Sequence, residues 1–316
     1  MQYFIGIDGG GTNSRLLAVD VHGNVIGHVR GRSTNLESNS ASTVMNNLSA
    51  LIQSFHDQHF TKYDDCLGLC FGTAGVDTKA SLLTIEDLLR QIPFTCPTKV
   101  VNDAHIALYA NTLGGPGLML IAGTGSIGYG INRSGRQKRV GGFGYIVGDE
   151  GSAYWVVRQA ISAALHAYDG SGPDTILVNA LTRALGFNEF EEIIDFVYRK
   201  NKSDLAKLSH VVASAQEDGD TIACAIFDEA LGYFIKTVEV LVADLGSDPM
   251  PLYKGGGFLM NNRFLNESFD RIVAEEFPQL CVDELKRPAE WGAVILAAEL
   301  SGYSLPDLIT RGVIMS

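Results

Sequence analysis

The sequence has little charge and no run of Lys or Arg. Charged residues make up 19% of the 316 positions, and 36 acidic residues outnumber 24 basic ones, which leaves a net charge of -12. Nucleic-acid affinity depends on basic side chains that neutralise phosphates, so we expect no nucleic-acid partner. Long apolar runs are also missing, which argues against a membrane span. The first residues lack the basic region of a secretory signal, and we therefore expect a cytoplasmic protein.

Cysteine is scarce, and the few cysteines match neither a disulfide framework nor a zinc site. The five are Cys66, Cys70, Cys96, Cys224 and Cys281. Their odd number and their spacing predict reduced thiols, in keeping with a cytoplasmic location. Hydrophobic residues nevertheless make up 46% of the chain. A chain of this length and composition can bury a large core and exceeds most single cores, which predicts two domains.

A pattern of strand, glycine corner, strand, turn and strand occurs twice in the first half of the chain. The first copy comprises residues 3–7, 8–11, 15–19, 22–24 and a strand from Val25. The second copy comprises residues 118–122, 123–126, 128–131, 132–135 and 136–140. Such a repeat predicts two related lobes, each of which contributes one glycine corner to a shared cleft. We place the boundary near Gly114–Gly117, which gives lobes of residues 1–115 and 116–316.

Apolar residues at helical spacing predict a helix over residues 42–59 and a second half that is mostly helical. The helices expected in the second half span residues 151–168, 174–185, 189–200, 204–215, 221–245 and 289–301, with another from Asn261. Further short strands are expected at residues 66–71, 98–101 and around 252–254.

The glycine corners suit anion binding, because glycine lacks the Cβ that would keep backbone N–H groups from closing round a phosphate. Gly9–Gly11, Gly123–Gly125 and Gly255–Gly257 each follow a strand. One corner alone is equally compatible with a tight β-turn. The run Gly123–Gly128 also spells the GxGxxG of dinucleotide-binding folds, but a strand follows it where that fold needs a helix. With no Walker A sequence in the chain, three corners favour a nucleotide held by β-hairpins.

The order of these motifs resembles that of the sugar kinase, Hsp70 and actin superfamily. Asp8–Thr12 and Gly123–Ser126 match its two phosphate loops, Asn102–Ala104 its catalytic segment and Gly255–Gly257 its adenosine loop. The run Gly141–Trp155 narrows the resemblance to the N-acetylglucosamine kinase and BadF/BadG/BcrA/BcrD ATPase family, and the motifs span nearly the whole chain. The resemblance implies an α/β, two-lobed, actin-like (ribonuclease H-like) ATPase fold. Each lobe would hold a mixed β-sheet with flanking helices, and ATP and sugar would lie between the lobes. The resemblance also implies a homodimer and makes the last helix a candidate to pack back on the first lobe.

The same resemblance implies ATP and Mg2+ as cofactors and assigns residues to them. The residues implied to bind ATP are Gly9, Gly10, Gly11, Thr12, Gly123, Thr124, Gly125, Gly255, Gly256 and Gly257. Asp8 lies where the superfamily places a carboxylate that holds magnesium through water. Asp103 matches the aspartate that accepts the proton of the attacking sugar hydroxyl, which phosphoryl transfer needs besides alignment and charge stabilisation. Taken alone, Asp8 would be a turn residue and Asp103 a helix cap.

A second group of residues is implied to hold the sugar. It comprises Asn35, Asp103, Ser126, Ile127, Gly142, Phe143, Gly144 and Asp149. The implied reaction is ATP-dependent phosphorylation of an amino sugar, with N-acetylglucosamine to N-acetylglucosamine 6-phosphate as the first expectation. The family's kinases carry Asn at the position of Ile127 and Trp at that of Phe143. Because a hydrogen-bonding amide beside the sugar is lost, glucosamine, N-acetylmuramic acid, N-acetylmannosamine and glucose stay as alternatives.

Two functions of other classes stay open. An ATPase that activates a partner enzyme occurs in the same broad family, where it carries a cysteine-ligated iron–sulfur cluster, but residues 103–170 contain no cysteine. A non-catalytic sugar sensor is the other alternative, and the retained Asp103 weighs against it. Phosphorylation of a sugar by ATP would separate the kinase from both.

Overall fold

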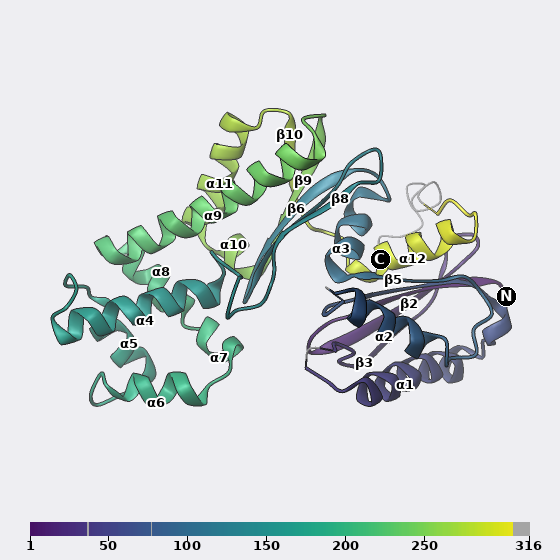
Figure 1. Ribbon diagram of the computed structural model, residues 1–316, viewed down its shortest axis with the longest axis horizontal. Coiled ribbons are helices and arrows are strands. Elements are labelled where there is room, and N and C mark those ends of the chain that lie inside the picture. Colours follow the sequence, from purple (N-terminus) through teal and green to yellow (C-terminus); the bar gives the residue numbers. More distant parts are fainter. Residues whose placement is uncertain (37, 77, 306–316) are drawn as a thin grey trace. The chain divides into compact units, whose positions relative to one another are not determined.

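The computed structural model describes residues 1–36, 38–76 and 78–305 (Figure 1). These residues form two compact units. Unit 1 joins residues 1–116 to the described residues from Leu285 onward, and unit 2 comprises residues 117–284. The chain thus leaves unit 1 after Pro116 and returns to it with its last helix, α12 (Ala289–Leu300). Among the described residues, no helix combines the length and the apolarity that a membrane crossing needs.

Unit 1 contains a mixed, five-stranded sheet in the order β3-β2-β1-β4-β5. Its strands are β1 (Tyr3–Gly9), β2 (Asn13–Asp20), β3 (Val25–Arg32), β4 (Cys66–Thr73) and β5 (Thr98–Asn102). The first three pair antiparallel, whereas β4 runs parallel to β1 and β5 parallel to β4. Antiparallel neighbours need only a tight turn, but parallel neighbours need a crossover, which helices supply. β1 is therefore the central strand, and Asp8 lies near its carboxyl end.

Helices cover both faces of this sheet (Figure 1). The helices of unit 1 are α1 (Ala41–His59), the single 3-10 turn η1 (Tyr63–Asp65), α2 (Lys79–Leu89), α3 (Asp103–Thr112) and α12. α1 and α2 pack on one face, in a core that contains Phe55 and Phe71. α3 and α12 pack on the other face, in a core that contains Phe4 and Ile106. Successive side chains of a strand point to opposite faces of the sheet, so they enter the two cores alternately.

Unit 2 repeats this topology, with the strand order β10-β9-β6-β7-β8. Its strands are β6 (Gly117–Ala122), β7 (Ser126–Ile131), β8 (Gln137–Gly141), β9 (Met250–Gly255) and β10 (Leu280–Glu284). Counted from β8 to β10, the sheet has the same pattern as that of unit 1. The first three strands pair antiparallel, and the last two continue the sheet in parallel. The repeat in the sequence corresponds to two sheets of one topology, and the predicted α/β fold class is confirmed.

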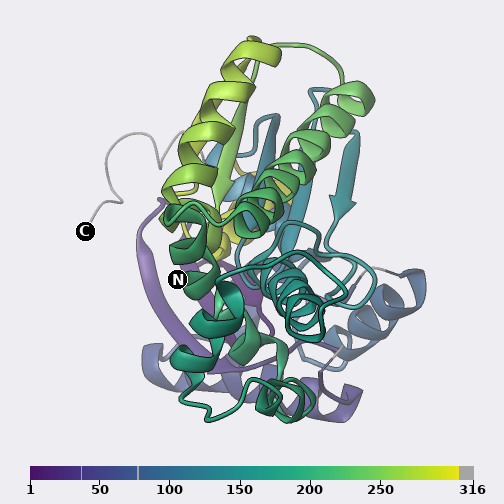
Figure 2. The same cartoon turned by 90° about the vertical axis from the view of Figure 1, so that its left-hand side faces the viewer.

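The helices of unit 2 share one large core with its sheet. They are α4 (Ala153–Asp169), α5 (Leu177–Leu185), α6 (Glu192–Arg199), α7 (Lys202–Ala206), α8 (Ser209–Glu217), α9 (Thr221–Leu245), α10 (Gly257–Asn261) and α11 (Arg263–Glu276). The core contains Leu118 of β6, Phe234 of α9 and Phe269 of α11. Figure 2 shows α9 and α11 side by side, in agreement with their contact.

The helix predicted over residues 204–215 is wrong, because the chain forms two helices, α7 and α8, with a break at residues 207–208. Leu205, Leu208 and Val212 are all buried, so the apolar spacing runs through the break unchanged. Periodicity reports which side of the chain faces the core and not whether the backbone bonds continue. Neither α2 nor β10 is predicted from the sequence pattern.

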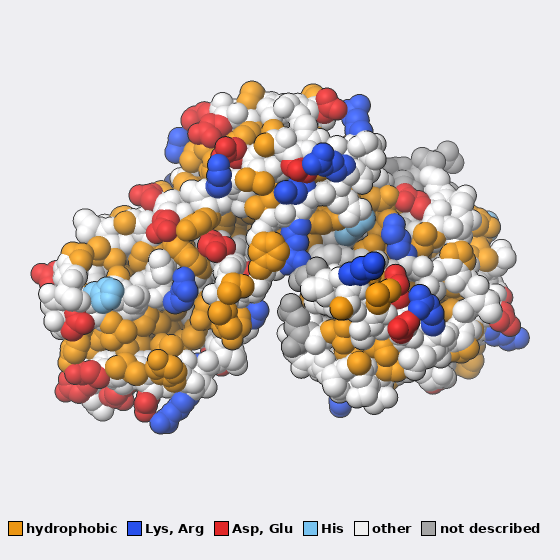
Figure 3. Space-filling model, in the orientation of Figure 1, with side chains coloured by type: hydrophobic (Ala, Val, Ile, Leu, Met, Phe, Trp, Pro, Cys, Tyr) orange, Lys and Arg blue, Asp and Glu red, His pale blue; other side chains and the backbone are white. Residues whose placement is uncertain are grey.

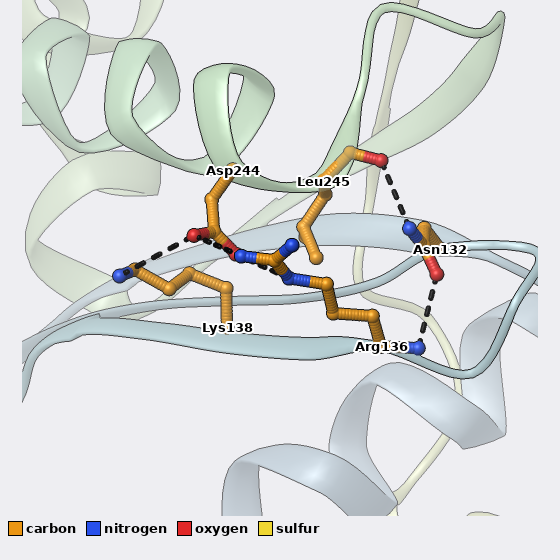
Figure 4. Close-up of polar contacts among 5 residues, drawn as sticks. All are labelled: Asn132, Arg136, Lys138, Asp244 and Leu245. Carbon is orange, nitrogen blue, oxygen red and sulfur yellow. Dashed lines mark hydrogen bonds and ion pairs between the residues drawn. The ribbon is translucent and has the colours of Figure 1, made fainter.

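A polar cluster ties the β7–β8 hairpin to the end of α9 (Figure 4). Asn132 Oδ1 accepts from the backbone N–H of Arg136 at 3.0 Å, while its Nδ2 donates to Leu245 O at 3.1 Å. Arg136 donates to both carboxylate oxygens of Asp244. Lys138 Nζ lies 3.8 Å from Asp244 Oδ1. Leu245 is the last residue of α9, so Asn132 satisfies one of the carbonyl groups that a helix leaves unpaired at its end.

α12 packs against β1 and α3 at glycine positions. A Cβ added at Gly6 of β1 would lie 2.4 Å from Val294 N. A Cβ added at Gly292 of α12 would lie 1.9 Å from Ile106 O of α3. Both distances are far inside van der Waals contact, and backbone atoms in a packed core cannot move apart cheaply. Glycine at these positions therefore sets how closely the last helix approaches its neighbours.

We expect Gly292→Ala to lower the free energy of unfolding by about 2 kcal/mol or more, because the methyl group must displace the backbone of α3. The matched control is Gly232→Ala within α9, where nothing lies within 4 Å of the added Cβ. There alanine should stabilise the protein by about 0.5–1 kcal/mol, because it favours the helix and restricts the unfolded chain. Urea denaturation followed by circular dichroism measures both variants. A stabilised Gly292→Ala protein would contradict the close approach.

Candidate functional site

The first glycine loop, residues 9–12, joins β1 to β2 in unit 1. Gly9 is buried, and a Cβ there would lie 2.6 Å from Thr34 Oγ1. Thr73 Oγ1, from the end of β4, donates to Gly9 O at 3.1 Å. The exposed members of the loop are Gly11 and Thr12. Hydroxyl groups from neighbouring elements thus fix the base of the loop, while its tip is accessible.

Asp8 and Asp103 lie at the carboxyl ends of β1 and β5, and both are half-buried. Asp103 is the first residue of α3, and its Oδ1 accepts from Ala104 N at 2.9 Å. Asn102 is the capping residue, and its Oδ1 accepts from the same N–H at 2.9 Å. Asn102 therefore caps the N-terminus of α3, and the Asp103 side chain is not required for this. The Asp103 carboxylate is near enough to Asp8 to raise the pKa of Asp8.

The electrostatic environment of Asp8 is unusual for a carboxylate. Its pKa is raised to about 7, mainly by burial and then by the negative charges of Glu290 and Asp103. The guanidinium of Arg15, its partner across the β1–β2 pair, acts in the opposite direction. Burial and like charges both disfavour an ionised carboxylate. This edge of the sheet would therefore be stabilised by an added positive charge.

Asn35 lies beside the first glycine loop. Its side chain is 6% exposed, and a Cβ added at Gly11 would lie 3.7 Å from its Nδ2. Asn39 Nδ2 donates to the backbone carbonyl of Asn35 at 3.0 Å and so fixes this segment. Unit 1 thus brings together Asn35, the first glycine loop and the two aspartates of the predicted site.

The second glycine loop, residues 123–126, is held by the segment that precedes and begins α4. The backbone N–H of Ala153, the first residue of α4, donates to Gly123 O at 2.9 Å. Ser126 Oγ donates to Glu150 O at 2.7 Å. The amide groups that a helix leaves unpaired at its start are strong donors, and here one holds the loop itself.

Asp149 connects this loop to the segment that follows β8. It is 5% exposed, and the backbone N–H groups of Ser126 and Gly144 both donate to its carboxylate. A Cβ added at Gly125 would lie 2.6 Å from its Oδ2. Its φ of 59° is a left-handed conformation that is costly for a residue other than glycine and clusters at functional sites. Burial raises the pKa of Asp149, and the nearby Lys202 lowers it.

The segment expected to hold the sugar is shaped by left-handed glycines. Gly142 and Gly144 have φ values of 70° and 87°, and a Cβ on Gly142 would lie 2.9 Å from the Ile127 side chain. Phe143 is 61% exposed, and the Arg139 guanidinium lies 4.9 Å from its ring centroid. Arg139 also donates to the backbone carbonyl groups of Gly141 and Gly142. Sequence reasoning missed Arg139, since one basic residue in a strand forms no motif.

A pocket of about 700 Å³ lies within unit 2, a volume typical of small-ligand sites. Its wall includes Gly123, Thr124, Lys207, His210, Gly257 and Arg263. Gly255 ends β9, and Gly256 has a φ of 90° and no room for a Cβ, which would lie 2.4 Å from Ala122 O. The second and third glycine motifs therefore meet at one pocket. The helices α7 and α8, which carry no glycine motif, supply much of the remaining wall.

The chain matches the BadF/BadG/BcrA/BcrD ATPase family over residues 5–297. This range contains every motif described above and most of both units. The chain therefore belongs to the BadF/BadG/BcrA/BcrD ATPase family, and the predicted family is confirmed.

Among its curated relatives are kinases of amino sugars. An N-acetylmuramic acid/N-acetylglucosamine kinase from Clostridium acetobutylicum is 34% identical over 301 residues, which cover 94% of this chain and 98% of the relative. An N-acetyl-D-glucosamine kinase from Dictyostelium discoideum is 28% identical over 311 residues, again 94% and 98% of the two chains. The likeness thus extends over both units and is not confined to the glycine loops.

Solved structures share the fold. A candidate N-acetylglucosamine kinase from Chromobacterium violaceum has a TM-score of 0.75 at 23% identity, with 94% of this chain and 99% of that chain covered. A ROK family glucokinase from Streptomyces griseus, in complex with glucose and AMPPNP, has a TM-score of 0.56 at 17% identity, with 94% and 99% covered. The fold is therefore that of the actin-like sugar kinases, as the sequence predicts.

The raised pKa of Asp8 predicts a pH-dependent stability in the metal-free protein. In the folded state the pKa is about 7, against 3.8 for an unperturbed side chain, so the folded state binds more protons between these values. The contribution of Asp8 to the free energy of unfolding should fall as the pH rises from about 4 to about 7. Asp8→Asn should therefore raise Tm at pH 8 and change it little at pH 4. Thermal unfolding in EDTA measures this, and a difference from wild type that is constant with pH would contradict it.

Proposed function

We propose that this protein is an ATP-dependent kinase of an N-acetylated amino sugar, with N-acetylglucosamine as the first candidate and its 6-phosphate as the product. The observation that carries the proposal is the proximity of two half-buried carboxylates, Asp8 and Asp103, beside a glycine loop. They occur in a chain that resembles amino-sugar kinases over nearly its full length. Phosphoryl transfer can use one carboxylate for the metal and the other for the proton.

ATP is proposed to bind at the glycine motifs. Gly123, Thr124 and Gly257 line the pocket of about 700 Å³, which would take the nucleoside. Gly9–Thr12 is the phosphate loop of unit 1, with an accessible tip. Lys207 and Arg263 lie in the pocket wall, where each pairs with a neighbouring carboxylate, Asp204 and Glu267 respectively. Membership of an ATPase family supports the choice of ATP.

Asp103 is proposed to accept the proton of the attacking sugar hydroxyl. The hydroxyl oxygen forms a bond to the γ-phosphorus, and the bond from that phosphorus to the oxygen shared with the β-phosphate breaks. The proton passes to the Asp103 carboxylate, and ADP leaves with the electron pair of the broken bond. Asp103 has a capping neighbour in Asn102, so its carboxylate is not required to begin α3.

Mg2+ is proposed to be held by Asp8 through water. Burial and two further carboxylates disfavour a lone negative charge on Asp8, so a cation would offset that cost. Among the described residues there is no group of three or more His, Cys, Asp or Glu side chains that could bind a metal directly. Mg2+ usually keeps several waters and takes few protein ligands, which fits this arrangement. The ion, when bound, would neutralise charge on the phosphates.

Eight residues are proposed to contact the sugar. They are Asn35, Asp103, Ser126, Ile127, Gly142, Phe143, Gly144 and Asp149. Asp149 is buried and shares its carboxylate between two backbone segments, so it would fix the sugar-binding segment relative to the second glycine loop. Ile127 packs behind Gly142 and offers no hydrogen bond to an acetamido group. Glucosamine, N-acetylmuramic acid, N-acetylmannosamine and glucose are therefore included in the test below.

We further propose a cytoplasmic homodimer. Hydrophobic side chains gather on unit 2 around α4–α6, at the left of Figure 3. The large apolar side chains exposed on or beside these helices are Tyr168, Ile176, Ile194 and Tyr198. An apolar surface of this kind is typical of a subunit contact.

Size-exclusion chromatography with light scattering should give twice the mass of the chain. Tyr198→Lys should shift the measured mass toward that of the monomer. A monomeric wild type would contradict the proposal.

An ATPase that activates a partner enzyme is the alternative from another class. Such activators carry a cysteine-ligated cluster, whereas all five cysteines here are free thiols. Cys66 and Cys70 are buried in unit 1, where Cys96 Sγ lies 3.6 Å from Cys66 Sγ. On the face drawn in Figure 3, Lys and Arg side chains are interspersed with Asp and Glu, which gives no support to a nucleic-acid partner. The kinase therefore remains the proposed function.

We expect purified protein to form ADP from ATP and Mg2+ only when an accepted sugar is present. The panel is N-acetylglucosamine, glucosamine, N-acetylmuramic acid, N-acetylmannosamine, glucose and no sugar. Asp103→Asn should lower kcat by about 100-fold to 10,000-fold, because it removes the general base while keeping the shape of the side chain. Asp64→Asn, in η1, is the matched control and should leave kcat unchanged.

A coupled assay for ADP and chromatography of the sugar phosphate give the two readouts. Hydrolysis of ATP that does not depend on a sugar would favour the partner-activating ATPase. Sugar binding without turnover would favour a sensor. Full activity of Asp103→Asn would refute the assignment of the base even if the kinase itself is confirmed.

A further inference from the structure

Glu290, in the first turn of α12, is a buried carboxylate that its surroundings only partly neutralise. Its side chain is 3% exposed, and its Oε1 lies 3.1 Å from His28 Nε2. Its Oε2 has no hydrogen-bond partner in the part of the chain that the structure describes. Arg15 Nη1 lies 3.9 Å from Oε2, beyond hydrogen-bonding distance, on a side chain that is 45% exposed. A buried carboxylate oxygen without a donor is costly and needs a physical reason.

The register of the sheet shows on which side this oxygen lies. Gly6 and His28 belong to one row across β1, β2 and β3, and Asp8 and Arg15 belong to the next row on the same face. Glu290 lies over the first row, because its backbone O is 2.5 Å from a Cβ built at Gly6. Oε1 pairs with His28 in that row, whereas the nearest cation to Oε2 is Arg15 in the row of Asp8. The unpartnered oxygen is therefore on the side of the first glycine loop.

Negative charge is in excess at this place. The carboxylates of Glu290 and Asp103 both act on Asp8, and Arg15 is the basic residue that counters them. The described residues include no set of ligands that would hold a bare metal ion here. A hydrated cation does not need such a set, because its waters can donate to carboxylates that are further apart. The donor missing from Glu290 Oε2 is of the kind that a metal-bound water supplies.

We propose that Glu290 is a second acceptor for the water shell of the magnesium ion, together with Asp8. This inference rests on the proposed function, since the ion would arrive with ATP. Glu290 is a positioning residue in this scheme: it orients the hydrated ion and touches neither the sugar nor the transferred phosphorus. His28 fixes Oε1, which leaves Oε2 directed toward the row of Asp8. α12 thereby adds a group to the site that none of the glycine motifs contains.

The test measures how much Mg2+ strengthens nucleotide binding. Isothermal titration calorimetry of the full chain with AMP-PNP, in excess Mg2+ and in EDTA, gives this gain as a ratio of dissociation constants. Glu290→Gln keeps the shape of the side chain and removes its charge, and should reduce the gain by about tenfold, the loss of one charge-assisted hydrogen bond. Glu299→Gln, on the same helix, is the matched control, because its Oε2 accepts from Tyr109 Oη at 2.7 Å away from this row. It should keep the full gain.

A second measurement separates this role from a purely structural one. Glu290→Gln keeps an amide oxygen that can accept from His28 and removes one buried negative charge, so Tm in EDTA should stay unchanged or rise. Lower Tm with an unchanged Mg2+ gain would assign Glu290 to the ion pairs with His28 and Arg15 and overturn the inference. Glu290→Asp, which keeps the charge but places the oxygens one methylene short, should also lose most of the gain and serves if Glu290→Gln fails to fold.

The outcomes distinguish this inference from the function on which it rests. If wild type binds AMP-PNP more tightly with Mg2+ and Glu290→Gln shows the same gain, the inference fails and the kinase proposal stands. If wild type shows no Mg2+-dependent binding of the nucleotide, both fail. A reduced gain in Glu290→Gln and Glu290→Asp, with Glu299→Gln unchanged, supports the inference.

Discussion

The close backbone approach of α12 to β1 and α3 is the contact on which unit 1 depends. It requires glycine at Gly6 and Gly292, where a Cβ would overlap backbone atoms. The central strand carries Asp8 and α3 begins with Asp103, so one packing contact fixes the elements that bear both carboxylates. The same contact places Glu290 over β1. A segment from late in the sequence thus packs beside two carboxylates that come from its first third.

The two units, each taken by itself, differ in the charges that surround their motifs. Unit 1 concentrates carboxylates at one edge of its sheet, which raises the pKa of Asp8. Unit 2 supplies glycine loops and basic side chains, with Lys202 beside Asp149 and Lys207 at the pocket wall. The buried, left-handed Asp149 shows that unit 2 also retains strain at its loops, as functional sites commonly do.

The sequence defined the site's motifs better than its helical framework. The glycine corners, the aspartate after β5 and the family were predictable, because each needs a particular residue at a particular place. The α/β fold class followed from the repeated strand pattern, which the two sheets confirm. The break between α7 and α8 and the existence of α2 were not predictable. Apolar spacing records burial, and burial at Leu205 and Leu208 continues across an interrupted backbone.

The sequence by itself therefore determined the fold class, the family and the glycine loops, because those depend on local backbone freedom and on the order of elements. Only the tertiary structure decided how closely the last helix approaches β1 and α3 and which carboxylates meet. Glu290 follows Asp8 by most of the chain's length, and nothing local to either residue records that they share one face of a sheet. Contacts between distant segments arise from packing, and packing is a property of the folded chain as a whole.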